Sequence, residues 1–241
     1  MKSDLAAKER RHSNKENLKE TFDWMADRYL DQTIAVSRGR YPGWMDHVVD
    51  VVAQARPESV ADVGCGPGYL VTRLKARLPG SEVVGVDNSP RMLDLVPPDI
   101  TTECRDLLDW GHDGGTQFDV IALTFVLRDQ RDPGEVLRSL KSRLAPGGRL
   151  VVLETQTPEG WRKKGFQLYF HRWMPWWGAH MLARDWPGPR ELAPYRWLSD
   201  SHAVWHQSHP LPDALEDAGY RNVQNHRRPN DVVMLWSAEK A

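Results

Sequence analysis

The chain has 241 residues, enough for one α/β domain with a sizeable hydrophobic core. Its 32 lysines and arginines against 33 aspartates and glutamates give a formal net charge of -1, which argues against a nucleic-acid-binding protein with a concentrated basic face. Its two cysteines, Cys65 and Cys104, form no CxxC pair, so we expect no metal site and no disulfide framework, as in a reducing cytoplasm.

The N-terminal residues 1–20 are highly charged and predict a charged arm or an exposed helix. They lack the apolar centre of a signal peptide, and no run of about 20 apolar residues predicts a membrane-spanning helix. No Gly/Ser-rich or Pro-rich linker divides residues 21–241, which we expect to form a single domain. Within it, the spacing of apolar side chains predicts helices over Thr21–Tyr29 and Trp44–Ala55.

From Ser59 onward the pattern alternates between strands and helices. Buried strands are predicted over Ser59–Val63, Glu82–Val86, Thr101–Cys104, Phe118–Phe125 and Arg149–Glu154. Helices are predicted over Tyr69–Leu78, over Ser89–Leu95 and from Asp132 to Leu144. Repeated strand–helix units imply a doubly wound, Rossmann-like α/β fold, with a mainly parallel sheet and helices on both faces.

The regular alternation stops after Glu154. Seven of the 11 tryptophans lie between Trp161 and Trp205, so the stretch at about 155–210 forms a specialised aromatic-rich insertion. Helical structure is expected over Trp161–Arg184, a Pro-rich loop over Trp186–Pro194 and a helix over Leu211–Ala218. Two last strands, Arg221–His226 and Val232–Ser237, are predicted to form an antiparallel hairpin.

The most informative motif is Asp62-Val63-Gly64-Cys65-Gly66-Pro67-Gly68, where the first strand runs into a glycine-rich turn that opens a helix. Glycines let the backbone approach a ligand closely, and the helix start offers free N–H groups. Dinucleotide enzymes require a third glycine where this chain has Tyr69, so the spacing disfavours a nicotinamide cofactor. Asp87 ends the second strand, where an acid can hold both ribose hydroxyls. The alternative is a loop whose glycines only turn the chain.

These residues resemble the class I S-adenosylmethionine (SAM)-dependent methyltransferases, and the resemblance implies SAM as the cofactor. It places Asp62, Gly64 and Gly66 at the methionine end, Asp87 at the ribose, Asn88 beside the adenosine, Asp106 at the adenine amino group, Leu107 against the ring and Thr124 near the sulfonium. Cys65, as a small filler of the loop, Gly68 and Met92 complete the expected cofactor-binding set. Asp106 has the alternative role of a helix cap.

The resemblance extends to one family. Thr21–Tyr29 (TFDWMADRY) is similar to the FDxxAxxY helix of the ubiquinone/menaquinone biosynthesis C-methyltransferases, and Leu123–Asp129 resembles their S-F-G-L-R-N stretch. Phe170–Pro175 and Tyr195–Ser201 resemble their F-H-x-x-P and Y-R-Y-L-x-E-S blocks. The departures fall on the acceptor side: Leu30 separates the usual Tyr-Asp pair, Asp129 stands where Asn is usual, and Pro229-Asn230-Asp231 replaces Thr-Gly-Gly.

The resemblance implies an enzyme that methylates a ring carbon of a quinol-like or other hydrophobic aromatic acceptor. Three alternatives stay open at this point. The acceptor can be a phospholipid amine or a natural-product oxygen or nitrogen, the chain can bind SAM without transferring its methyl group, or it can be a nicotinamide oxidoreductase.

The catalytic candidates follow from the need to activate an aromatic carbon by deprotonating a neighbouring hydroxyl. Arg128 and Asp129 are the preferred pair, because they follow the strand that ends beside the expected methyl group. Arg128 is expected to stabilise the phenolate, and the alternative for this pair is an ion pair with Arg131 at a helix start. Other candidates are His171, His202 and His206 as bases, and Tyr29 and Tyr195 as residues that orient the ring.

The aromatic-rich segment has two interpretations. As a lid over a hydrophobic acceptor it would touch a membrane surface, because Trp favours interfaces between oil and water. Arg162, Lys163, Lys164 and Arg172 could then meet lipid headgroups. Otherwise the same side chains form core packing or a homodimer interface.

Overall fold

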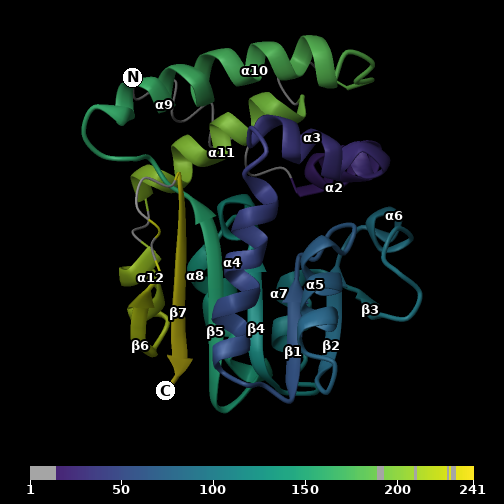
Figure 1. Ribbon diagram of the computed structural model, residues 1–241, viewed down its shortest axis with the longest axis vertical. Coiled ribbons are helices and arrows are strands. Elements are labelled where there is room, and N and C mark those ends of the chain that lie inside the picture. The colour runs from purple at the N-terminus through teal and green to yellow at the C-terminus, as the bar shows by residue number, and fades with distance from the viewer. Residues whose placement is uncertain (1–14, 189–192, 209–210, 227, 229–231) are drawn as a thin grey trace.

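The sheet of the computed structural model has seven strands in the order β3-β2-β1-β4-β5-β7-β6 (Figure 1). The structure describes residues 15–188, 193–208, 211–226, 228 and 232–241. The strands are β1 Ser59–Val63, β2 Glu82–Asp87, β3 Thr101–Cys104, β4 Phe118–Thr124, β5 Leu144–Thr155, β6 Tyr220–Asn225 and β7 Val233–Lys240. Neighbouring strands from β3 to β5 pair in parallel, whereas β7 pairs antiparallel with both β5 and β6. This topology confirms the doubly wound fold with a C-terminal antiparallel hairpin.

Helices cover both faces of the sheet because alternate strand residues point to opposite sides. In β1, Ala61 and Val63 pack in one core cluster, while Val60 packs in the other. The helices of the first face are α7 Leu107–His112, α8 Pro133–Leu140 and α12 Leu211–Asp217. Those of the second face are α4 Tyr41–Gln54 and α5 Tyr69–Arg77. The short α6, Pro90–Leu93, follows β2.

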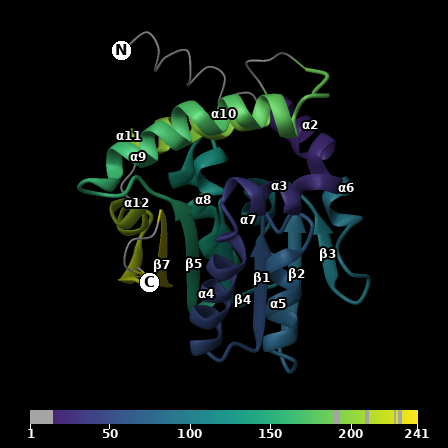
Figure 2. The ribbon, with the colours of Figure 1, turned by 45° about the horizontal axis from the view of Figure 1, so that its top comes forward.

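A further layer of helices lies over the carboxyl ends of the parallel strands (Figures 1 and 2). It consists of α2 Lys15–Met25, η1 Ala26–Arg28, α3 Tyr29–Val36, α9 Arg162–Leu168, η4 Tyr169–Trp173, α10 Met174–Trp177, η5 Gly178–Leu182 and α11 Pro194–Ser208. The stretch from α9 to η5 forms a rod on the outside of this layer, and η4 and η5 are π-helical turns within it. Such turns occur frequently at functional sites.

The structure corrects the predicted elements in this layer. Helix α2 begins at Lys15, inside the predicted arm, and the helix expected over Thr21–Tyr29 is divided among α2, η1 and α3. Helix α11 was not predicted. Its buried positions include Ser199, Asp200, Ser201 and His202, so the apolar periodicity that signals a helix is interrupted.

Smaller differences lie elsewhere. Helix α7 was also missed, because it has only six residues and starts at the capping residue Asp106. Strand β5 begins at Leu144 rather than Arg149, with an irregularity in its pairing with β4. The predicted loop Trp186–Pro194 ends where α11 begins, and its residues 189–192 lie outside the described part.

Candidate active site

The glycine-rich turn between β1 and α5 is shaped by close packing. The Gly64 N–H and Cys65 N–H both donate to the Val86 carbonyl, at 2.7 and 3.0 Å. Gly64 has φ +77°, and a Cβ at this position would lie 2.4 Å from Cγ2 of Val126. Only glycine satisfies both constraints. The turn therefore exposes the backbone of Gly64 and Gly66 on the wall of a cleft at the ends of β1, β2 and β4.

Asp87 joins this turn to the next strand. Its Oδ2 accepts a hydrogen bond from the Gly66 N–H at 2.9 Å, and its Oδ1 accepts one from the Ser89 N–H at 2.9 Å. Burial raises the pKa of Asp87, and the backbone donors oppose that rise. Each carboxylate oxygen has a second lone pair, so Asp87 can still accept hydrogen bonds from two ribose hydroxyls in the cleft.

Asp62 lies beneath the turn rather than on the cleft wall. Its side chain is fully buried, and within the described residues no side chain donates a hydrogen bond to its carboxyl oxygens, although the backbone N–H of Val71 acts to lower its pKa. Burial, followed by the charge of Asp87, raises the pKa of Asp62 to about 8. A buried carboxyl without a side-chain donor behind a glycine cradle fits the cationic methionine end of SAM.

Asp62 makes stability depend on pH in a defined direction. Because folding raises its pKa, the folded protein binds the proton more tightly, and stability is lost as pH rises from about 4 to about 8. Asp62→Asn should flatten this dependence and stabilise the cofactor-free protein by about 2–4 kcal/mol near pH 9. Urea unfolding from about pH 5 to pH 9 measures the effect, with the exposed Asp99→Asn as control. Parallel curves for wild type and Asp62→Asn would contradict it.

Some of the remaining predicted cofactor residues line the cleft, and the others pack behind its wall. Asn88, Met92, Asp106, Leu107 and Thr124 line the cleft, whereas Cys65 and Gly68 do not. The Cys65 sulfur faces Gly85 of β2, where it fills space beneath the turn. Gly68 has φ +84° and precedes α5. The cleft residues that the sequence did not single out are Leu18, Lys19, Phe22, Val63, Val86, Arg105, Phe125, Val126 and Gln130.

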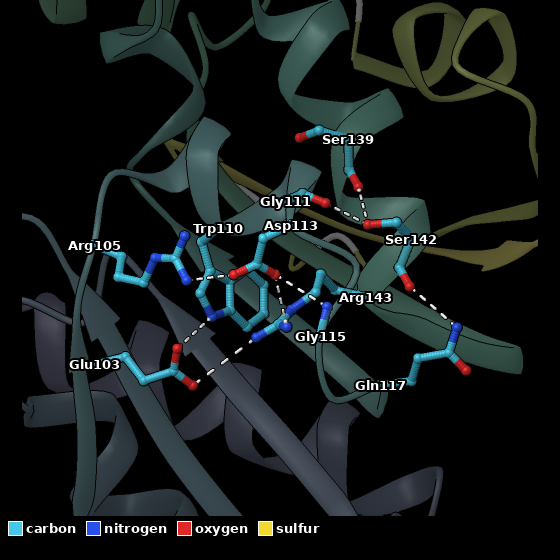
Figure 3. A network of polar contacts seen from close by, with 10 residues as sticks. All are labelled: Glu103, Arg105, Trp110, Gly111, Asp113, Gly115, Gln117, Ser139, Ser142 and Arg143. Atoms are coloured by element: carbon cyan, nitrogen blue, oxygen red, sulfur yellow. Dashed lines mark hydrogen bonds and ion pairs between the residues drawn. The ribbon is translucent and has the colours of Figure 1, made fainter.

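The end of the cleft beside β3 is held by a network of polar contacts (Figure 3). Asp106 is a helix cap as well as a wall residue, because its Oδ1 accepts a hydrogen bond from the Leu108 N–H at 3.0 Å. Its neighbour Arg105 pairs with Asp113, which also pairs with Arg143 at 3.1 Å. The buried Arg143 guanidinium stacks over the Trp110 ring, 4.0 Å from its centroid. This network fixes the turn that places Arg105 and Asp106 at the expected adenine end.

A second cavity of about 500 Å³ adjoins the cleft beneath the upper helical layer. It shares Phe22, Tyr29 and Phe125 with the cleft, so these three rings stand at the junction. Phe125 has φ +61°, a strained value for a bulky residue and one that occurs mainly at functional sites. Other cavity-lining aromatic side chains are Tyr41, Trp44, Trp161, Phe166, Tyr169, Phe170, Tyr195 and Trp197. The cavity fits a hydrophobic molecule with a ring next to the cleft.

A buried ionic cluster lies at this junction. Arg128 Nη1 donates to Oε1 of Glu154, and the Arg128 N–H donates to Oε2 at 3.3 Å. Arg128 Nε lies 3.4 Å from Oδ1 of Asp129. Arg128 lines the cavity, while Asp129 lines the cleft. Arg128 therefore pairs with both Asp129 and Glu154. The sequence analysis missed Glu154 because it lies 26 residues from Arg128, on β5.

Electrostatics within the junction favour protonated acids. Burial raises the pKa of Asp129 well above its ordinary value, Arg128 opposes the rise, and Glu154 adds to it. Burial also raises the pKa of Tyr29 to about 12, so its hydroxyl stays protonated at neutral pH. Burial therefore favours the protonated form of Asp129 in the absence of a further positive charge.

The other predicted catalytic residues have different positions. The ring of Tyr195 lines the cavity, but its hydroxyl donates to Gln32 Oε1. His171 Nδ1 lies 2.9 Å from Ser199 Oγ, and the His202 ring lies tilted against that of Phe170, with the ring centroids 4.8 Å apart. Neither histidine lines the cleft or the cavity. The side chain of His206 lies outside the described residues. His171 and His202 therefore lie behind the aromatic side chains that line the cavity rather than at the junction.

Comparisons with known proteins agree with this geometry. The ubiE/COQ5 methyltransferase family matches residues 10–240. A demethylmenaquinone methyltransferase of Thermus thermophilus is 32% identical over 203 residues, which cover 81% of this chain and 87% of that protein. A ubiquinone/menaquinone biosynthesis C-methyltransferase UbiE of Geotalea daltonii is 25% identical over 239 residues, covering 93% of this chain and 97% of that protein.

Two solved structures share the fold at low sequence identity. Human N-acetylserotonin methyltransferase in complex with SAM has a TM-score of 0.55 at 17% identity, covering 87% of this chain and 55% of that chain. The plantazolicin methyltransferase BpumL in complex with S-adenosylhomocysteine (SAH) has a TM-score of 0.60 at 11% identity, covering 100% of this chain and 99% of that chain. These likenesses show the class I methyltransferase fold.

Proposed function

The chain belongs to the ubiE/COQ5 methyltransferase family, a family of SAM-dependent enzymes, and we propose that it methylates a ring carbon of a quinol that carries an apolar side chain. The observation that supports this acceptor is the cavity of about 500 Å³ that meets the cofactor cleft at Tyr29 and Phe125. Relatives named demethylmenaquinone methyltransferase point to the same class of acceptor.

The chemistry divides between the cofactor and the side chains at the junction. Bound SAM supplies an electrophilic methyl group. Phe22, Tyr29 and Phe125 hold the acceptor ring, and positioning of this kind carries much of the rate of a methyl transfer. The guanidinium of Arg128 stabilises the phenolate that makes the ring carbon nucleophilic. Asp129, on the cleft side of the same cluster, accepts the proton that the ring carbon gives up after methyl transfer, whereas the hydroxyl proton leaves to solvent and is regained from it.

An acceptor panel tests this proposal against the alternatives. Purified protein is incubated with radiolabelled SAM and a prenylated quinol, the corresponding oxidised quinone, a phosphatidylethanolamine or a water-soluble catechol. We expect transfer to the quinol, and none to the quinone, because only the reduced ring has a hydroxyl to ionise. Transfer to the amine or the catechol with none to the quinol would replace the proposed acceptor. Cofactor binding without transfer to any member would indicate a non-catalytic protein.

We further propose that the rod from α9 to η5 contacts a membrane surface. Three of its apolar side chains, and that of Trp161 directly before α9, are more than half exposed: Trp161 at 85%, Leu168 at 65%, Trp176 at 60% and Met181 at 67%. Basic side chains on the same rod are Arg162, Lys163, Lys164 and Arg172. Such a mixture suits the headgroup region of a bilayer. None of the helices in the described residues is long and apolar enough to span a membrane.

Liposome flotation tests the membrane contact. We expect wild type to float with anionic vesicles at low salt and to be released at high salt, because headgroup attraction is screened. The double variant Trp161→Ser, Trp176→Ser should lose most of this association. The matched control is Leu95→Ser, which removes a side chain of 42% exposure outside the rod. Absence of wild type from the vesicles, together with a dimeric mass in solution that the double variant loses, would assign this face to a homodimer instead.

A further inference from the structure

The ionic cluster at the junction contains more negative than positive groups. It consists of one guanidinium, Arg128, and two carboxyls, Asp129 and Glu154, with 9%, 6% and 0% of their side chains exposed. With both acids ionised, the cluster would carry a net charge of -1 in a site largely removed from water. A buried net charge is costly unless a proton or a counter-ion neutralises it.

The hydrogen bonds indicate which acid holds the proton. Glu154 Oε1 accepts from Arg128 Nη1 and from the Thr155 N–H at 2.9 Å, while its Oε2 accepts from the Arg128 N–H. Both carboxyl oxygens of Glu154 thus have hydrogen-bond donors. Asp129 Oδ1, in contrast, has no hydrogen-bond donor among the described residues and only the ion-pair contact with Arg128 Nε. Hydrogen bonds therefore do less to stabilise a negative charge on Asp129 than on Glu154.

Among the described residues, the cleft wall beside Asp129 brings no further unpaired cation. Of the basic side chains on the cleft wall, Lys19 pairs with Asp23 and Arg105 pairs with Asp113. The Tyr29 hydroxyl also interacts with the charges of Arg128 and Asp129, and α11, which carries the buried Asp200 and His202, packs against the turn Leu127–Asp129. The charges that act on Asp129 are those of Arg128 and Glu154, and burial raises its pKa in addition.

We propose that Asp129 is protonated while the cleft holds no cation and releases that proton when the sulfonium of SAM binds, so that the junction distinguishes SAM from neutral SAH by charge. The sulfonium supplies the positive charge that the ionised cluster lacks. Because linkage is reciprocal, SAM affinity should rise as pH rises through the pKa of Asp129, whereas SAH affinity should change little. This inference rests on the cofactor assignment and does not depend on the acceptor.

The same charge balance gives Asp129 a part in each turnover. As the ring electron pair forms the new carbon–carbon bond, the carbon–sulfur bond breaks and its electron pair stays on sulfur, which becomes neutral. The cluster then again carries an uncompensated charge of -1. Asp129 is thereby driven to take the proton that the methylated ring carbon gives up. The released SAH leaves the enzyme with Asp129 protonated, ready for the next SAM.

Calorimetry without any acceptor tests the inference. SAM and SAH are titrated into wild type in phosphate and in Tris buffer, whose ionisation enthalpies differ, near pH 7. The buffer dependence of the binding enthalpy gives the number of protons released. We expect up to about one more proton released with SAM than with SAH. Both ligands carry the same amino group, so its contribution to proton release largely cancels when the value for SAH is subtracted from the value for SAM.

Two variants serve as matched controls. Asp129→Asn removes the titrating group, and Glu154→Gln removes the excess charge, so each should abolish the difference in proton release between SAM and SAH. Asp129→Asn should also weaken SAM about tenfold near pH 8 and leave SAH within about twofold. A wild type that releases equal numbers of protons with both ligands, or folded variants that retain its difference, would overturn the inference. An inactive enzyme with intact proton release would count against the acceptor alone.

Discussion

Arg128→Ala is expected to lower both kcat and kcat/KM about a hundredfold or more, while SAM affinity changes far less. The guanidinium lies on the cavity side of the junction, where it can stabilise negative charge on the acceptor oxygen during transfer. A loss confined to transition-state stabilisation lowers kcat and kcat/KM together. Steady-state kinetics with the quinol and calorimetry with SAM measure the two parts of this prediction.

The controls separate this effect from misfolding. Removing one partner of a buried ion pair costs about 3–5 kcal/mol, so the thermal unfolding of Arg128→Ala must be measured alongside its kinetics. Arg128→Lys keeps the charge but loses the forked geometry that reaches Glu154, and should be impaired by about tenfold. The exposed Arg131→Ala should behave as wild type. Normal turnover in a folded Arg128→Ala protein would remove Arg128 from the catalytic site.

Asp87→Ala is expected to weaken SAM binding by about tenfold or more. Charge-assisted hydrogen bonds are worth about 1.5–3 kcal/mol, and the substitution removes the acceptor for two ribose hydroxyls. It also removes the acceptor of the Gly66 and Ser89 N–H groups, so the glycine turn loses its tie to β2. The exposed Asp94→Ala is the matched control. Calorimetry showing wild-type affinity in Asp87→Ala would remove Asp87 from the cofactor site.

The cofactor half of the site was predictable because its signals are local. A strand, the turn at Gly64 and Gly66, a helix and the acid Asp87 follow one another within about 30 residues, and the parallel topology brings the strand ends to one edge. The same locality explains the limits of the motif. It could not indicate that Cys65 faces the sheet or that Asp62 lies beneath the turn, because both depend on packing with neighbouring strands.

The acceptor half depends on contacts between distant parts of the chain. Arg128 and Asp129 were predicted as site residues because their segment resembles a known family motif. The sequence indicates Glu154 only as the last residue of an apolar strand. The strained backbone of Phe125 has no sequence signature. The histidines were predicted as bases because an imidazole can exchange a proton near neutral pH. Their positions depend on α11, which was not predicted because its buried polar residues interrupt the apolar pattern of a helix. Tertiary packing, not local propensity, assembles this half of the site.

The position of the transferred methyl group tests the central claim most directly. Wild-type protein, SAM with a deuterated methyl group and a prenylated quinol that has one unsubstituted ring carbon are incubated under reducing conditions, and the product is analysed by NMR. We predict that the deuterated methyl group is bonded to that ring carbon, with both hydroxyls free. A deuterated methyl group on a hydroxyl oxygen would contradict carbon methylation by this site.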